Sequence, residues 1–150
     1  MKKSISILAL PSLLLLTACA GQVPSDLGLV NGEVLRPCPD KPNCIQTYAP
    51  MDKSHFQKPL TVKANNEETK QAISAAIVET GGHIISEKSL RPNGIYLHAE
   101  YESDWLKFVD DVEVLIKNDA IHIRSASRLG HSDMGVNAER FEKIKAVYEQ

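Results

Sequence analysis

One stretch near the end of the chain concentrates polar side chains that could do chemistry. Residues 124–140 read RSASRLGHSDMGVNAER, with three arginines, three serines, one histidine and two acids. A guanidinium binds a carboxylate or a phosphate through two parallel hydrogen bonds, so this composition favours either a site for an anionic ligand or a network of ion pairs. Both interpretations stay open from the sequence.

A second polar stretch carries carboxylates that could face these arginines. Residues 108–116 read FVDDVEVLI, with three acids among apolar residues. Alternating apolar and polar residues predict strands over 106–117 and 120–128. Asn118-Asp119 between them predicts a hairpin turn, so the acids and the first arginines are expected on neighbouring strands.

One register of this hairpin keeps its branched apolar residues on one face. With Lys117 opposite Ala120, Glu113 lies opposite Arg124, and Asp111 lies diagonally from it. Opposite charges across a strand pair contribute about 0.2–1 kcal/mol. A slip of one residue would expose the row of Val and Ile, so we expect the register to be well specified.

The two stretches together supply a candidate binding site. Arg124 or Arg128 is expected to hold a small anionic ligand among acidic, hydroxyl and imidazole groups, unless these groups form a structural network instead. The candidate residues are Asp110, Asp111, Glu113, Arg124, Ser125, Ser127, Arg128, His131, Ser132, Asp133, Asn137 and Arg140.

A small periplasmic hydrolase is the alternative function. Its nucleophile would be one of the serines of this stretch, Ser125, Ser127 or Ser132. His131 would act as the base and Asp133 would orient it, but two residues this close on a loop have no orienting geometry of their own. No G-x-S-x-G elbow surrounds a serine. We therefore name no catalytic residue.

A metal site is a further alternative. Its ligands would come from the acids and one histidine, namely Asp110, Asp111 and Glu113 with His98 or His122. Successive residues of a strand point to opposite faces, so these carboxylates converge poorly on one ion. We expect neither a metal nor a cofactor.

Periodicity places both stretches in an α+β domain. The periodic segments are a helix over 65–80 with Asn65 or Asn66 as N-cap, strands over 83–88 and 95–101, the two hairpin strands, and a helix over 138–149 with Asn137 as N-cap. This order predicts an antiparallel sheet of about four strands with two helices packed on one face, a two-layer sandwich.

The start of the chain has the layout of a secretory signal peptide. Lys2 and Lys3 precede an apolar run, residues 5–16, that is shorter than the roughly 20 residues of a spanning helix. Residues 16–19, Leu-Thr-Ala-Cys, resemble the bacterial lipobox. That resemblance implies cleavage before Cys19 and acylation of this cysteine, and two or more acyl chains hold a protein on a bilayer.

The residue after the acylated cysteine bears on localisation. In the lipoprotein sorting pattern an Asp there retains the protein in the inner membrane, so Ala20 implies the periplasmic face of the outer membrane of a Gram-negative envelope. The predicted organisation is a signal peptide over 1–18, a lipidated tether over 19–35 and a single domain over 36–150.

The charge balance bears on the class of partner. Removal of the leader takes two lysines away, which leaves 17 minus 2, or 15, basic residues against 19 acidic ones. A mildly acidic chain without a basic run argues against nucleic-acid binding.

The two remaining cysteines are expected to form a disulfide. Cys38 and Cys44 occur in RPCPDKPNCI with five residues between them, whereas a redox pair usually has two. A metal pair would want further ligands at short spacing, and none follows. Closing this loop stabilises the fold by roughly 2 kcal/mol. The prolines of residues 36–60 predict an irregular segment around it.

Four motifs of the chain resemble the bacterial domain of unknown function 1499 family. They are Cys-Pro…Pro-Asn-Cys at 38–44, Asp-Asp-Val-Glu at 110–113, Arg-Ser-Ala-Ser-Arg-x-Gly at 124–130 and Ser-Asp-x-Gly-x-Asn-x-x-Arg at 132–140. They occur in this order within residues 36–149, so the resemblance is specific. It singles out these residues and implies no activity for them.

The sequence therefore predicts an envelope lipoprotein that binds rather than catalyses. The expected partners are the lipid bilayer, through acylated Cys19, and an envelope protein or a small anionic ligand at the arginines. No nucleic-acid partner is expected.

Overall fold

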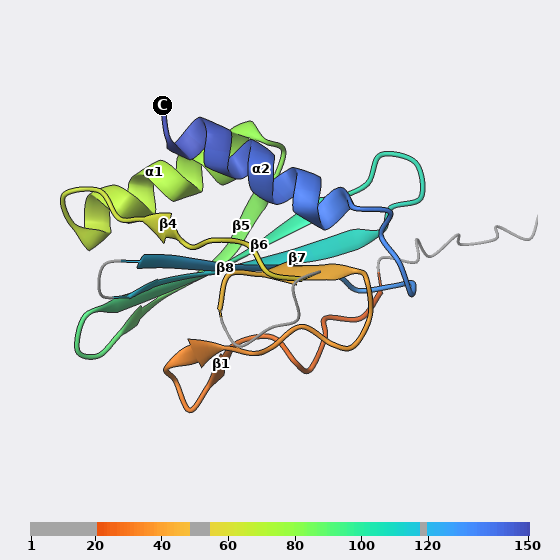
Figure 1. Ribbon diagram of the computed structural model, residues 1–150, viewed down its shortest axis with the longest axis horizontal. Coiled ribbons are helices and arrows are strands. Elements are labelled where there is room, and N and C mark those ends of the chain that lie inside the picture. Colours follow the sequence, from red (N-terminus) through yellow and green to blue (C-terminus); the bar gives the residue numbers. More distant parts are fainter. Residues whose placement is uncertain (1–20, 49–54, 118–119) are drawn as a thin grey trace, which may run out of the picture.

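The computed structural model describes residues 21–48, 55–117 and 120–150 (Figure 1). The predicted signal peptide, the lipidation site at Cys19 and the hairpin tip at Asn118-Asp119 lie outside the described residues. The elements are β1 (Leu29–Val30), β2 (Val34–Leu35), β3 (Cys44–Gln46), β4 (Leu60–Thr61), α1 (Asn66–Glu79), β5 (His83–Leu90), β6 (Gly94–Glu102), β7 (Val109–Lys117), β8 (Ala120–Ser127) and α2 (Val136–Tyr148).

The predicted α+β class is confirmed, with more strands than expected. The main sheet is antiparallel in the order β3-β8-β7-β6-β5, and β4 also pairs with β8, which makes six strands rather than about four. The two extra strands come from the proline-rich segment that was expected to be irregular. Strands of only two and three residues fit between its prolines. Such short segments carry no recognisable strand pattern, and they are strands because their backbones pair with β8.

The β7–β8 hairpin has the predicted register. Lys117 pairs with Ala120 and Glu113 with Arg124, and Asp110 is opposite the last residue of β8. The strands alternate strictly, so the Val and Ile row points to one face of the sheet and the charged row to the other. The polar positions of the motifs are thereby divided between the two faces.

Helices α1 and α2 cover the apolar face of the sheet (Figure 1). The core lies between these layers, and its fully or almost fully buried side chains include Ile73, Ile77, Leu97, Val112, Val114, Ile116, Ile121, Ile123, Phe141 and Ile144. Burial of each such side chain is worth about 1.5–3 kcal/mol. No helix of the described residues is long and apolar enough to cross a bilayer.

The predicted cap of α1 is confirmed and that of α2 is wrong. The side chain of Asn65 accepts a hydrogen bond from the backbone N–H of Glu68. Helix α2 begins at Val136, and its N-cap is Gly135 rather than Asn137. Gly135 has a φ of 87°, which glycine adopts without steric cost. Asp133 accepts the first N–H groups of the helix, so the Asn137 side chain bonds elsewhere.

The segment before β3 lies against the sheet face opposite the helices, which differs from the tether expected over 19–35 (Figure 1). β1 and β2 form a small hairpin, and Leu35 at its end is buried. Asp26 and Gly28 bond side chains of the sheet, as described below. The disulfide between Cys38 and Cys44 is present as predicted. Residues of this segment therefore contribute to the domain itself.

Candidate functional site

All four motifs meet at one end of the sheet, where β7 begins and β8 ends. Strand alternation sends Asp110, Ser125 and Ser127 to the face that α2 covers. Asp111, Glu113, Arg124 and Arg128 point to the opposite face, under the N-terminal segment. The polar cluster expected from the sequence is therefore two networks, separated by the sheet.

We call the first the N-terminal-face network; it consists of Asp26, Gly28, Tyr96, His98, Glu100, Asp111, Glu113, Arg124 and Arg128. At its centre Arg124 donates to Glu113 at 2.8 Å and to Asp26 at 2.7 Å. The Arg124 residue is 2% exposed and Glu113 is fully buried. A buried charge is strongly disfavoured unless paired, so Arg124 and Glu113 depend on each other.

Two further donors complete the bonding of Glu113. The Tyr96 hydroxyl and the backbone N–H of Gly28 both donate to its Oε1 atom. Burial, followed by the neighbouring Glu113 carboxylate, raises the pKa of Tyr96, so its hydroxyl stays protonated as a donor. Gly28 belongs to the N-terminal segment, which is thus tied to the sheet by a backbone bond as well as by Asp26.

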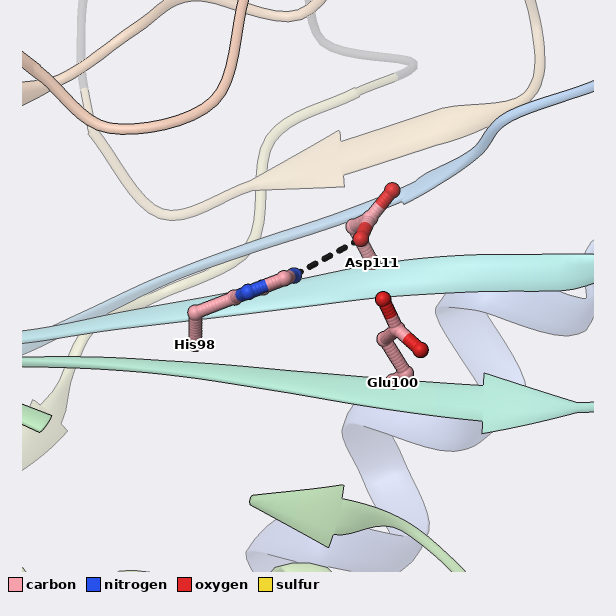
Figure 2. A group of neighbouring side chains, drawn as sticks. All are labelled: His98, Glu100 and Asp111. Carbon is pink, nitrogen blue, oxygen red and sulfur yellow. Dashed lines mark hydrogen bonds and ion pairs between the residues drawn. The ribbon is translucent and has the colours of Figure 1, made fainter. Parts of the chain in front are cut away.

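Arg128 binds Asp111 through two parallel hydrogen bonds of 2.8 and 2.7 Å and also binds Glu100. His98 lies 2.7 Å from the same Asp111 carboxylate, as Figure 2 shows. Burial acts to raise the pKa of Asp111, but the bonds from Arg128 and His98 outweigh it and hold the pKa below the usual 3.8. Asp111 is therefore a carboxylate at neutral pH.

We call the second the helix-face network; it consists of Asn43, Asp110, Ser125, Ser127, Asp133, Asn137 and Arg140. Asn137 is fully buried, and its amide donates to Ser127, Asp133 and the backbone of Asn43. Its carbonyl oxygen accepts from Ser125 and Arg140. One side chain of α2 therefore joins the helix to β8 and to the segment before β3.

Arg140 closes the helix-face network one turn later along α2. It donates to Asp110 at 2.6 Å, and its guanidinium lies 4.6 Å from the centre of the Tyr101 ring. A cation over an aromatic face adds electrostatic attraction to the ion pair. The fourth motif therefore forms the start of α2: Asp133 accepts backbone N–H groups there, Asn137 links the helix to β8, and Arg140 pairs with Asp110.

Asp133 serves the helix rather than an external group. Its carboxylate accepts from the backbone N–H groups of Gly135 and Asn137 and from the Asn137 amide. Burial acts to raise its pKa, but these bonds outweigh burial and lower it. A carboxylate already occupies the N-terminus of α2, where an anionic ligand would otherwise find unpaired N–H groups.

The structure does not bring together the serine, histidine and aspartate residues of the hydrolase alternative. His131 and Ser132 are exposed, and within the described residues no hydrogen bond joins His131 to Ser125, Ser127 or Ser132. Ser125 is buried and donates to Asn137. Asp133 is engaged at the helix start, so the predicted set shares no common geometry.

The structure brings together a possible metal-ligand group that overlaps only in part with the set named from the sequence. His98, Glu100 and Asp111 offer ligand atoms within 4.8 Å of one another, and Figure 2 shows them converging from β6 and β7. His98 and Asp111 were among the ligands considered and Glu100 was not, whereas Asp110, Glu113 and His122 are not part of this group. The Arg128 guanidinium binds both carboxylates of the group, so a cation already lies between them.

The charge of the N-terminal-face network argues against a small anionic ligand. Two arginines face four carboxylates, those of Asp26, Glu100, Asp111 and Glu113. Even with His98 protonated, the acids outnumber the cations by one. A hollow of about 180 Å³ lies beside Arg124 and Arg128, which is smaller than the roughly 300–1,000 Å³ of ordinary ligand pockets.

A larger hollow of about 320 Å³ lies between the start of α2 and the disulfide-bonded strand β3. It falls within the usual size range of small-molecule sites. Its lining is mainly apolar with a few polar groups: Pro42, Cys44, Ile45, His55, Ser132, Asp133, Met134, Gly135 and Ala138. Of the predicted site residues, Ser132 and Asp133 line this hollow.

Several participants were missed from the sequence. Tyr96 and Glu100 share one face of the expected strand 95–101 with His98, which was considered only as a metal ligand, and joining that face to the hairpin would have found them. Asn43 lies within the first motif, but nothing in the sequence indicates that its side-chain amide donates a hydrogen bond to the backbone carbonyl of Gly130. Asp26 comes from a segment without periodicity.

Comparison with known proteins identifies one family. The model of a family described as protein of unknown function (DUF1499) matches residues 34–147. No curated protein and no solved structure matches the chain. The match contains all four motifs and lies close to the limits expected from them, so the predicted family is confirmed.

Removal of Arg124 tests whether the N-terminal-face network is structural. Arg124→Ala leaves Glu113 buried without its cation, so we expect a loss of about 3–5 kcal/mol in the free energy of unfolding. Lys143→Ala, which removes an exposed ion pair with Glu139, is the matched control and should leave the melting temperature nearly unchanged. Normal stability of Arg124→Ala in thermal and urea denaturation would contradict the structural role.

Acid titration of stability tests the pairing of Asp111. Because its pKa is lower in the folded state, its contribution is complete above the unfolded value of 3.8 and is lost as the pH falls through the folded value. Asp111→Asn should therefore be less stable at neutral pH and lose less stability between about pH 4 and pH 2. Exposed Glu149→Gln should keep the wild-type profile, and parallel curves for Asp111→Asn and wild type would refute the pairing.

Proposed function

The chain belongs to the DUF1499 family of proteins of unknown function, and we propose that it is a lipid-anchored binding module of the cell envelope that catalyses no reaction. The observation that carries this proposal is that the buried ionic and hydroxyl groups of the motifs bond groups within the domain. A nucleophile needs a base within hydrogen-bond reach, and Ser125, which is buried, donates to the amide oxygen of Asn137 instead.

The anchor is inferred from the first residues of the sequence. A positive start, an apolar run and the Leu-Thr-Ala-Cys stretch at 16–19 support export and acylation of Cys19. Ala20 supports the outer membrane, with the domain on its periplasmic side. The Cys38–Cys44 disulfide is compatible with an oxidising compartment.

The binding site that we propose is the hollow between α2 and β3. Its apolar lining and its size favour a small uncharged molecule, or one apolar side chain of an envelope protein partner. Asp133 at its edge is ionised and satisfied by backbone N–H groups, which disfavours an anion there. The ligand class is therefore neutral, rather than the anion expected from the arginines.

Replacement of the acylated cysteine tests the anchor. We expect the full chain, produced in a Gram-negative bacterium, to incorporate labelled palmitate and to fractionate with the outer membrane. Cys19→Ser removes the sulfur that accepts the lipid and should abolish incorporation, whereas Cys38→Ser/Cys44→Ser should retain it. Label in the Cys19→Ser chain would place the modification elsewhere and refute the assignment.

A neutral fluorophore tests the hollow. N-phenyl-1-naphthylamine should bind residues 20–150 saturably, and Ala138→Trp, which fills the hollow, should weaken binding by about tenfold or more. Ala146→Trp places the same side chain on an exposed position of the same helix and should bind the fluorophore as wild type does. Circular dichroism checks that both variants fold.

The result that would reject the hollow is equal affinity in these two variants. Preferential binding of the sulfonated analogue, 8-anilinonaphthalene-1-sulfonate, by the wild-type chain would favour an anion site and would contradict the neutral ligand class.

A further inference from the structure

The loop between β6 and β7 presents large apolar side chains to solvent. Trp105 is 94% exposed, Leu106 62% and Phe108 43%, all within the six residues 103–108. A tryptophan this exposed leaves most of its apolar surface in water, where burial against another surface would be favourable. The loop is therefore the strongest candidate for a contact surface on the domain.

The loop is held in a defined conformation. The backbone N–H of Ser103 donates to Phe108 at 2.9 Å, and the N–H of Phe108 donates back to the Ser103 hydroxyl at 3.0 Å. Lys107 forms an ion pair with Glu102 at 3.0 Å. The bonds close the loop at its base, so the apolar side chains project from a fixed turn.

More exposed apolar side chains lie at the same end of the sheet. Ten large apolar side chains are exposed in the described part of the chain, and six of them belong to this loop and to the segment leading into α2. The six, which we call the apolar end surface, are Trp105, Leu106, Phe108, Leu129, Met134 and Val136. The two segments are joined by the hydrogen bond from Arg128 N–H to the Val109 carbonyl.

The described chain also begins at this end (Figure 1). A Cβ atom built on Gly21 would lie 3.2 Å from Cβ of Arg128 and 3.4 Å from Cγ of Leu129. Cys19 is two residues earlier in the sequence, and two residues span at most about 7 Å. Acyl chains on Cys19 would therefore enter the bilayer beside the apolar end surface.

We infer that the apolar end surface lies against the lipid bilayer that holds the Cys19 acyl chains, with Trp105 in the headgroup region. This inference rests on the proposed lipid anchor. Tryptophan is suited to the membrane interface because its ring is apolar and its N–H is a donor. The surface carries no basic cluster, since Lys107 is paired with Glu102, so contact depends on apolar insertion and needs no anionic lipid.

Trp105 is the single tryptophan of the chain and reports directly on this contact. The full acylated protein is reconstituted into phosphatidylcholine vesicles, and two readouts are taken: flotation with the vesicles, which reads the anchor, and Trp emission, which reads the loop. We expect the emission to shift to shorter wavelength relative to detergent-free Cys19→Ser protein. We also expect phosphatidylcholine brominated on its acyl chains to quench most of it.

The matched control moves the tryptophan to the other end of the sheet. Asn93 lies in the exposed turn between β5 and β6, opposite the apolar end surface, so Trp105→Phe/Asn93→Trp should float equally well without a shift or quenching. Equal quenching of this double variant would overturn the inferred orientation.

Two further outcomes overturn the inference and are distinguishable. Flotation with unchanged Trp105 emission would support the anchor and show that the apolar end surface does not contact the bilayer. Failure to float shows that the anchor itself is absent, and the lipid contact fails with it.

Discussion

The antiparallel pairing of β7 with β8 in one register determines how the motif residues are used. A strand alternates its side chains, so Asp-Asp-Val-Glu and Arg-Ser-Ala-Ser-Arg each send polar groups to both faces. Glu113 and Arg124 meet under the N-terminal segment, while Asp110 and Ser125 meet α2 on the other side. A slip of one residue would exchange the faces and bury charges in the core. Both networks therefore require this register.

The N-terminal segment depends on that register as well. Asp26 and Gly28 bond Arg124 and Glu113, whose positions the strand pairing fixes. The N-terminal segment is therefore bound to the domain at the Glu113–Arg124 pair, and its first described residue, Gly21, lies beside Leu129. With so few residues between Gly21 and the proposed acylation site, a bilayer would lie close to the end of the sheet, which connects the buried networks to the exposed loop around Trp105.

The sequence was most informative where side chains repeat with a period. The order of helices and long strands, the Glu113–Arg124 pair and the core face followed from alternation and capping, because those signals are local. The pairing of Asp110 with Arg140 was not predicted, because Arg140 reaches Asp110 only through the direction in which α2 crosses the sheet. β3, β4 and Asp26 were missed for a similar reason: their conformations are fixed by contacts distant in sequence, and short segments carry little periodicity.

The buried ion pairs raise the question of why apolar residues do not occupy these positions. Replacing a buried pair with well-packed apolar groups is often neutral or stabilising, so stability alone does not account for Arg124 and Glu113. Apolar contact tolerates several arrangements, whereas Arg124 pairs with both Glu113 and Asp26 only when the N-terminal segment docks in one position. In a domain whose proposed anchor lies just before that segment, such docking would fix how the domain is oriented toward the bilayer. On this argument the motif residues specify orientation, and the binding that we propose takes place elsewhere, at the hollow beside α2 and at the exposed apolar end surface.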